Sequence, residues 1–103
     1  IQAGTRVLAN IADVSLKSLD GVYIAGAFGN YINWKNAMRI GLLPEVGEEK
    51  IRSLGNGARA GARMALLCAE KLGAAVELAR SVQYVELSAR EDFQMEFMEA
   101  MMF

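Results

Sequence analysis

The stretch from Val22 to Asn30 joins an apolar run to closely spaced glycines, and it is the part of the sequence best suited to hold a ligand. Val22 to Ala25 is β-favouring and apolar on both faces, as is typical of a buried parallel strand. Glycine permits tight turns and removes the side chain where a ligand approaches the backbone, often a nucleotide. Gly26 and Gly29 are therefore candidate ligand contacts, although tight strand-to-helix turns use glycines for steric reasons alone.

A second glycine segment, Gly55-Asn56-Gly57, follows a weaker strand predicted over 51–54. Ligands of open α/β sheets lie beyond the carboxyl ends of the strands, so two such turns side by side form a plausible cradle. Gly55, Asn56 and Gly57 join the candidate contacts on this ground. The alternative is that the small residues up to Ala62 only allow close helix packing, and the two interpretations are compatible.

Strands that alternate with helices must position these turns, and the pattern predicts an α/β fold. Apolar residues at three- and four-residue intervals predict a helix over 2–13. Asn33 is a candidate N-cap for a helix ending near Ile40, and Ser88 with Glu91 matches the capping box of a final helix. We expect two further helices, over 58–72 and 74–81, separated by Gly73, and a third strand over 84–87. Parallel neighbours need long connections, so the prediction is a small parallel sheet of about three strands with crossover helices.

The composition indicates one packed unit and excludes several classes of function. The 103 residues are 53% hydrophobic and 22% charged, and a net charge of −1 leaves no positive excess to attract nucleic acid. One cysteine, Cys68, and no histidine argue against a metal site or iron–sulfur cluster held by these residues alone. No apolar run is long enough to cross a membrane, so a cytoplasmic location is expected. The start at Ile1, without methionine and almost at once helix-like, suggests that residues 1–103 are one segment of a longer protein.

Four stretches together resemble the C-terminal region of the ATP-dependent reductive activators of corrinoid proteins. They are Val22 to Asn30, Asn36 to Pro44, the Gly55-Asn56 loop with Gly61 to Leu67, and Tyr84 to Phe103. The resemblance spans nearly the whole chain, in order and with similar gaps, which makes it more specific than any one glycine motif. Residues 1–103 are accordingly interpreted as the C-terminal part of an actin-like ATPase domain.

The resemblance implies a partial actin-like (ribonuclease H-like) lobe, of the superfamily that includes sugar kinases, acetate kinase and heat-shock chaperones. Two lobes of such proteins close over ATP, and a strand followed by a small-residue turn contacts the adenosine. Ile24 to Gly29 matches that motif, so the resemblance implies adenosine contacts at Gly26, Ala27 and Gly29.

Members of the family use ATP to drive electrons from a 2Fe–2S cluster to an inactive cobalt(II) corrinoid protein, which returns to the active cobalt(I) state. The cluster's cysteines, the phosphate-binding hairpins and the acidic residues that position magnesium and water are all expected upstream of Ile1. We therefore expect no catalytic residue and no metal ligand among these 103 residues, and no measurable ATP binding by them alone.

Several side chains, near the glycine turns and in the last predicted helix, each allow two interpretations of their role. Arg59 is either a phosphate contact or a solvated residue of the first helical turn. Tyr31 and Trp34 either stack on an adenine ring or pack the core of a short helix. The stripe of Phe93, Phe97 and Met101 is either the buried side of the last helix or an adaptable surface for a corrinoid protein or another subunit.

Two other functions compete with the activator. One is a non-catalytic interaction or scaffold domain, whose glycines serve only turns and helix packing. The other is an activator ATPase of another actin-like branch, such as those serving acyl-CoA dehydratases. Where the rest of the protein is missing, bare apolar surface favours self-association, so a homodimer is also expected.

Overall fold

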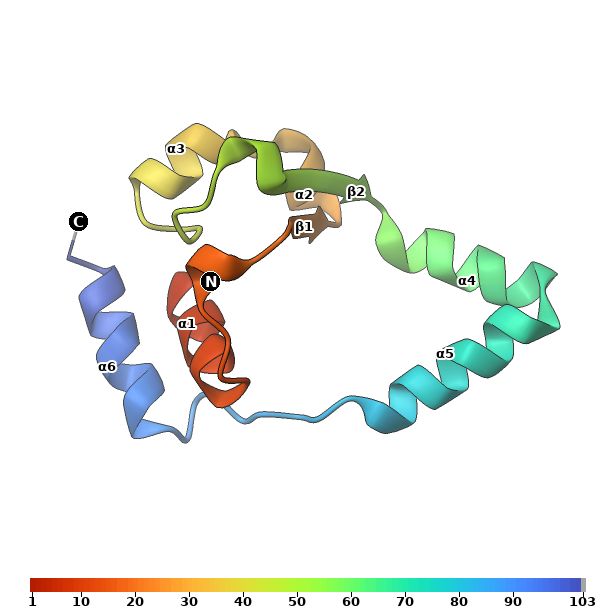
Figure 1. The fold of residues 1–103 in the computed structure, drawn as a ribbon. Coiled ribbons are helices and arrows are strands. Elements are labelled where there is room, and N and C mark those ends of the chain that lie inside the picture. Colours follow the sequence, from red (N-terminus) through yellow and green to blue (C-terminus); the bar gives the residue numbers. More distant parts are fainter. Residues whose placement is uncertain (103) are drawn as a thin grey trace.

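The computed structural model describes residues 1–102, with Phe28 described by its backbone alone. The helices and strands alternate as predicted for an α/β fold (Figure 1). In chain order they are α1 (Gln2–Ile11), β1 (Val22–Ala25), α2 (Ala27–Tyr31), α3 (Trp34–Arg39), β2 (Ile51–Gly55), α4 (Gly57–Leu67), α5 (Ala69–Ser81) and α6 (Glu91–Ala100). Short 3-10 turns, Leu16–Ser18 and Glu48–Lys50, precede β1 and β2.

The two strands form a parallel pair, and this pair is the whole sheet within residues 1–102. Val22 lies opposite Ile51, and a register shift between Ile24 and Ala25 sets Gly55 opposite Ala25. Both strands therefore end at the same edge. The segment between them, with α2 and α3, forms the long connection that parallel neighbours need, and α2 packs against both strands.

The predicted third strand over 84–87 is wrong. Val82 to Glu86 is irregular, and Tyr84 is 83% exposed. α4 and α5 carry the chain away from the sheet, and the return segment runs past the far end of the molecule, out of reach of β1 and β2 (Figure 1). Without a neighbouring strand, the polar side chains of this segment bond to one another. The Glu86 carboxylate accepts hydrogen bonds from the Ser88 and Tyr84 hydroxyls, which hold the pKa of Glu86 below its usual range.

Those bonds also explain why the predicted capping box is wrong. Ser88 gives its hydroxyl to Glu86, and α6 begins only at Glu91, after Arg90 in the N-cap position. No side chain caps this helix; instead the Arg90 guanidinium pairs with Asp92 in the first turn at 2.8 Å. The helix predicted to start at Ser88 therefore starts later and by a different contact.

The boundary between α4 and α5 also differs from the prediction. The break falls at Cys68, which is extended (φ −145°, ψ 114°), and Gly73 lies inside α5. A glycine costs a helix only about 1 kcal/mol relative to alanine, so Gly73 does not force an end. The two helices reverse direction at Cys68 and pack against each other, a tertiary contact that local spacing does not reveal.

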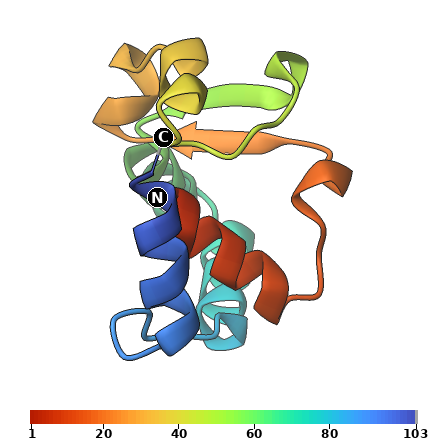
Figure 2. The same ribbon diagram turned by 90° about the vertical axis from the view of Figure 1, so that its left-hand side faces the viewer.

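The core is small and centres on α1, as the predicted amphipathic helix requires. Ala3 and Val7 of α1 are buried, together with Ala37 of α3 and Leu43. α1 and α6 lie side by side (Figures 1 and 2), and a Cβ on Gly4 would come within 3.2 Å of a Leu87 methyl group.

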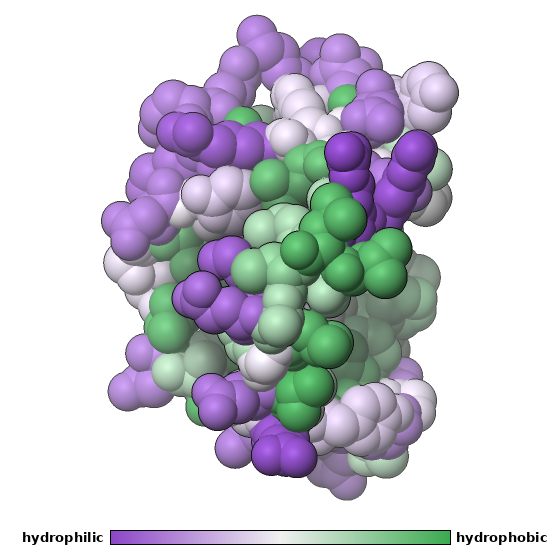
Figure 3. All heavy atoms as spheres, turned by 90° about the vertical axis from the view of Figure 1, so that its right-hand side faces the viewer, coloured by the Kyte–Doolittle hydropathy of each residue, from purple (hydrophilic) through white to green (hydrophobic). Residues whose placement is uncertain are grey.

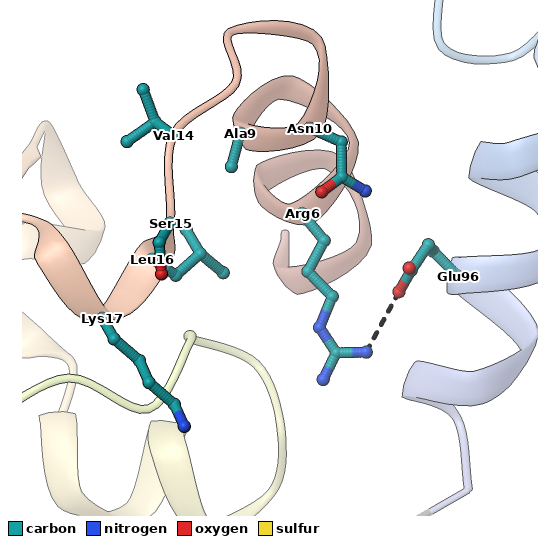
Figure 4. A pocket seen from close by; sticks show the side chains of 8 residues that line it. All are labelled: Arg6, Ala9, Asn10, Val14, Ser15, Leu16, Lys17 and Glu96. Atoms are coloured by element: carbon teal, nitrogen blue, oxygen red, sulfur yellow. Dashed lines mark hydrogen bonds and ion pairs between the residues drawn. The ribbon is translucent and has the colours of Figure 1, made fainter.

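An ion pair joins the two helices at the edge of this core. Arg6 Nη1 lies 3.0 Å from Glu96 Oε2, and both side chains face a hollow of about 320 Å³ between α1, the segment after it and α6 (Figure 4). The pair is partly exposed, so it orients α6 on α1 more than it stabilises the fold.

The predicted N-cap of α3 is confirmed. Asn33 Oδ1 accepts a hydrogen bond from the Asn36 backbone N–H at 3.0 Å. Gly41, with φ +70°, follows the end of the helix, as expected of a glycine C-terminal stop. None of the helices in residues 1–102 is both long and apolar enough to cross a membrane.

The burial of Val7 predicts a contrast between neighbouring positions on α1. Val7 is completely buried, whereas Leu8 is 46% exposed. Val7→Ala should lower the free energy of unfolding by about 1–3 kcal/mol, because it leaves a cavity at a completely buried position. Leu8→Ala, the matched control, should cost less than about 1 kcal/mol. Chemical denaturation of both variants tests this, and an equal or larger loss in Leu8→Ala would contradict the packing described.

Candidate functional site

The two glycine turns meet at the carboxyl edge of the parallel pair. The Gly26 backbone N–H donates a hydrogen bond to the Gly55 carbonyl oxygen at 2.6 Å. This bond extends the ladder by one step beyond β1 and fixes the two turns to each other. The register shift makes the bond possible, because it brings Gly55 rather than Leu54 level with the end of β1. The sequence-based expectation that the turns lie side by side is confirmed.

The main chain at Gly26 is left open. Gly26 is exposed and has φ +84°, a conformation that L side chains rarely adopt. A Cβ placed there would meet no atom within 4 Å apart from its chain neighbours, so the space beside it is open as far as the described side chains are concerned, which do not include that of Phe28. Ala27 follows, also exposed, as the first residue of α2. The chain thus passes from β1 into this short helix through a single-residue turn.

Gly29 has a different environment. It is buried, and a Cβ would lie only 2.7 Å from the Ile24 carbonyl oxygen and 3.2 Å from Ser53 Oγ. Its N–H donates to the Gly26 carbonyl oxygen at 3.1 Å. Gly29 thus lets α2 pack closely on the ends of both strands, and it shapes the turn from beneath.

The second turn combines a left-handed glycine with a helix cap. Gly55 has φ +60°. Asn56 is the N-cap of α4, and its Oδ1 accepts a hydrogen bond from the Arg59 N–H at 2.9 Å. A Cβ on Gly57 would lie 3.4 Å from the Ala25 side chain, an ordinary contact. Gly55 thus supplies the left-handed turn and Asn56 uses its side-chain oxygen in the cap, whereas no contact among the described residues requires glycine at position 57.

Sequence reasoning missed two side chains that connect the turns. Ser53 Oγ accepts a hydrogen bond from the Gly55 N–H at 3.3 Å and donates to Asn30 Oδ1 at 3.4 Å. Asn30 thus joins α2 to the end of β2. A polar residue on a weak strand was the only available signal, and its meaning depends on the register that sets Ser53 opposite Ile24.

The flanking aromatic and basic residues fall at different depths. Tyr31 is 89% exposed, so the expectation that it packs in the core is wrong, whereas Trp34 is half-buried. Arg59 is exposed and, with Arg63 and Asn56, lines a hollow of about 340 Å³ beside the second turn.

The expected cofactors fit these residues unequally. Gly26 and Ala27 are exposed, and the space beside Gly26 lets a ligand such as a nucleoside approach the main chain. Within residues 1–102 no group of three or more His, Cys, Asp or Glu side chains could hold a metal ion, and Cys68 is a single free thiol. An iron–sulfur cluster needs several ligands and does not fit the described residues.

Comparisons with known proteins give one consistent result. A family model described as the C-terminal domain of RACo, the ASKHA domain, matches residues 1–103. The chain is 38% identical over 103 residues to the corrinoid activation enzyme RamQ of Eubacterium limosum. The aligned region covers 100% of this chain and 17% of RamQ. It is also similar to a solved reductive activator for a corrinoid, iron–sulfur protein, with a TM-score of 0.87 and 42% identity over 98% of this chain and 16% of the other.

The chain spans about one sixth of the length of each of these relatives. The TM-score of 0.87 shows that the solved relative shares the fold described above. The chain therefore belongs to the family of corrinoid reductive activators, and it matches the model of their C-terminal, actin-like ASKHA domain.

Proposed function

We propose that residues 1–103 form one wall of the nucleotide site in a longer, ATP-dependent reductive activator. In this proposal the full-length protein returns cobalt(II) corrinoid proteins to the active cobalt(I) state, and residues 1–103 are the C-terminal part of its ATPase domain. A 2Fe–2S cluster and the groups that bind Mg²⁺ and phosphate belong to the part of the protein outside these residues.

The observation that carries the proposal is the open main chain at Gly26. A left-handed glycine beside empty space, at the carboxyl edge of a parallel pair, suits a flat ligand that must approach the backbone closely. Because the Gly26 N–H is already bonded to Gly55, the contact we propose is van der Waals packing of the nucleoside against Gly26 and Ala27. Gly29 supports this surface by close packing, Gly55 and Asn56 support it through the second turn and its cap, and Gly57 begins α4 directly after them.

The role of this surface in the mechanism is to couple nucleotide binding to lobe closure. A ligand that contacts both walls of a cleft binds the closed arrangement more tightly and shifts the population toward it. Bound ATP supplies the free energy that makes an uphill electron transfer possible. Gly26 and Ala27 orient the nucleoside in this proposal. The hydrogen bond from Gly26 to Gly55 links that contact to α4, which begins directly after the second turn.

The partner of the full-length protein in this proposal is a corrinoid protein. The two relatives are described as acting in corrinoid activation, which supports this partner. The balanced charge of residues 1–103 supports a partner other than nucleic acid, and we propose a cytoplasmic location. The homodimer expected from the sequence stays a prediction.

Substitutions at the open turn test the nucleotide contact. In the full-length protein, Gly26→Val should weaken ATP and ADP binding by at least about tenfold, because a side chain fills the space beside the main chain and strains the backbone. Ala27→Leu blocks the same surface without a left-handed φ, so it separates steric blocking from strain. Isothermal titration calorimetry measures both.

Glu45→Ala is the matched control, since Glu45 is exposed in the loop before β2, whereas both turns follow the carboxyl ends of the strands. Its nucleotide affinity should equal that of the unmodified protein. Unchanged affinity in folded Gly26→Val and Ala27→Leu would remove the nucleotide contact and favour the scaffold-domain alternative.

The cap at Asn56 gives a second test, on the turn that supports the surface. Asn56→Ala should lower stability by about 1 kcal/mol, because the Arg59 N–H loses its acceptor. Asn56→Asp keeps an oxygen in place and should retain most of that stability. Denaturant midpoints of the full-length variants measure the difference, and equal losses in both would show that the cap contributes little.

A further inference from the structure

The α4–α5 hairpin stands apart from the rest of the structure. The two helices pack against each other, and no residue of either helix is buried. Figure 1 shows the hairpin projecting from the end of β2 and returning only through the irregular segment before α6. Packing of α4 against α5 is thus the main contact that holds the hairpin together.

The exposed surface of the hairpin is strongly apolar. Leu66 is 85% exposed, Leu67 72% and Leu78 66%. Met64, Leu72 and Val76 are also more than 40% exposed, and apolar side chains cover much of this side of the molecule in Figure 3. Leu72 and Val76 share one side of α5, while Leu78 points to another. Helices that are apolar on several sides are normally buried within a larger protein.

The hairpin also lacks the means to be stable in water alone. α4 has 11 residues and α5 has 13, lengths at which isolated helices are marginal. Each helix contains an interior glycine, Gly61 or Gly73, beside which no atom lies within 4 Å. Each glycine costs about 1 kcal/mol relative to alanine, and no contact in residues 1–102 requires it. Close approach by protein outside these residues would account for both.

The total exposed area is larger than that of a compact protein of the same mass. The accessible surface is 8159 Å², whereas a compact protein of 11.2 kDa exposes about 5,700 Å². The radius of gyration is 15.8 Å, against about 13 Å for a compact domain of this length. The excess of roughly 2,500 Å² is about three times what one partner contributes to a standard protein–protein interface. The surface therefore needs a large, permanent covering.

We propose that the remainder of the same polypeptide covers the α4–α5 hairpin, which inserts between other elements of the full-length domain. This inference rests on the proposal that residues 1–103 belong to a longer chain. The relatives are about six times as long as this chain, and a polypeptide of that length would have enough further residues to cover the hairpin. Apolar residues on several sides fit a permanent insertion, whereas a second copy or a corrinoid protein would cover one side.

The position of the hairpin gives this insertion a consequence for the ligand site. α4 begins directly after the Gly55-Asn56 turn, which is bonded to Gly26. Anchoring α4 in the remainder of the polypeptide would therefore fix the second turn, and with it the open surface at Gly26, relative to the opposite wall of the cleft.

Hydrogen exchange on the full-length protein, without nucleotide or corrinoid protein, tests the covering. The backbone amides of α5 should exchange at least about 100-fold more slowly than an unstructured chain, and the protection should not change over a dilution series. Amides of the loop over 45–47 serve as the fast-exchanging reference. Protection that falls on dilution would assign the surface to a second copy and overturn the proposal.

Two other outcomes would also overturn it: protection that appears only when a corrinoid protein is added, and no protection at all. Leu66→Asp should speed exchange of α5 by at least about tenfold, while Leu8→Asp on α1 should leave α5 unchanged. If Leu66→Asp does not fold, the dilution series on the unmodified protein decides alone. Because no nucleotide is used, the result is independent of the calorimetric test of Gly26 and Ala27.

Discussion

The hydrogen bond from the Gly26 N–H to the Gly55 carbonyl oxygen holds the candidate site together. It joins the ends of two parallel strands that are separated in sequence by the whole connection through α2 and α3. Two left-handed glycines and a one-residue register shift are needed to form it. Gly29, Ser53 and Asn56 then fix the elements on either side, because each bonds or packs against one of the two turns.

This arrangement separates the residues that shape the surface from those that are open to a ligand. Gly26 and Ala27 are exposed, whereas Gly29 is buried where a side chain would strike the Ile24 carbonyl. Glycine therefore suits positions 26 and 29 for different physical reasons. One leaves room outside the molecule, and the other allows close packing inside it.

Local patterns predicted much of this structure, and they failed where distant contacts decide. The strand over 22–25, the Asn33 cap and the pairing of the glycine turns follow from spacing, capping chemistry and the rule for parallel sheets. The third strand over 84–87 does not form, because a β-favouring run needs a neighbour and the hairpin carries it away from the sheet. Ser88 lost its predicted cap to Glu86, and the break at Cys68 depends on packing between α4 and α5. The link between Asn30 and Ser53 required the register, which composition does not encode.

The exposed hairpin and the open turn both support the proposal that the chain belongs to a larger, nucleotide-binding domain. The central claim is that a nucleoside lies against the main chain at Gly26. A crystal structure of the full-length protein with ADP or a non-hydrolysable ATP analogue tests it most directly. The account predicts the nucleoside in van der Waals contact with Gly26 and Ala27, at the carboxyl edge of β1 and β2. A nucleotide bound elsewhere, with the space beside Gly26 filled by other protein atoms, would contradict it.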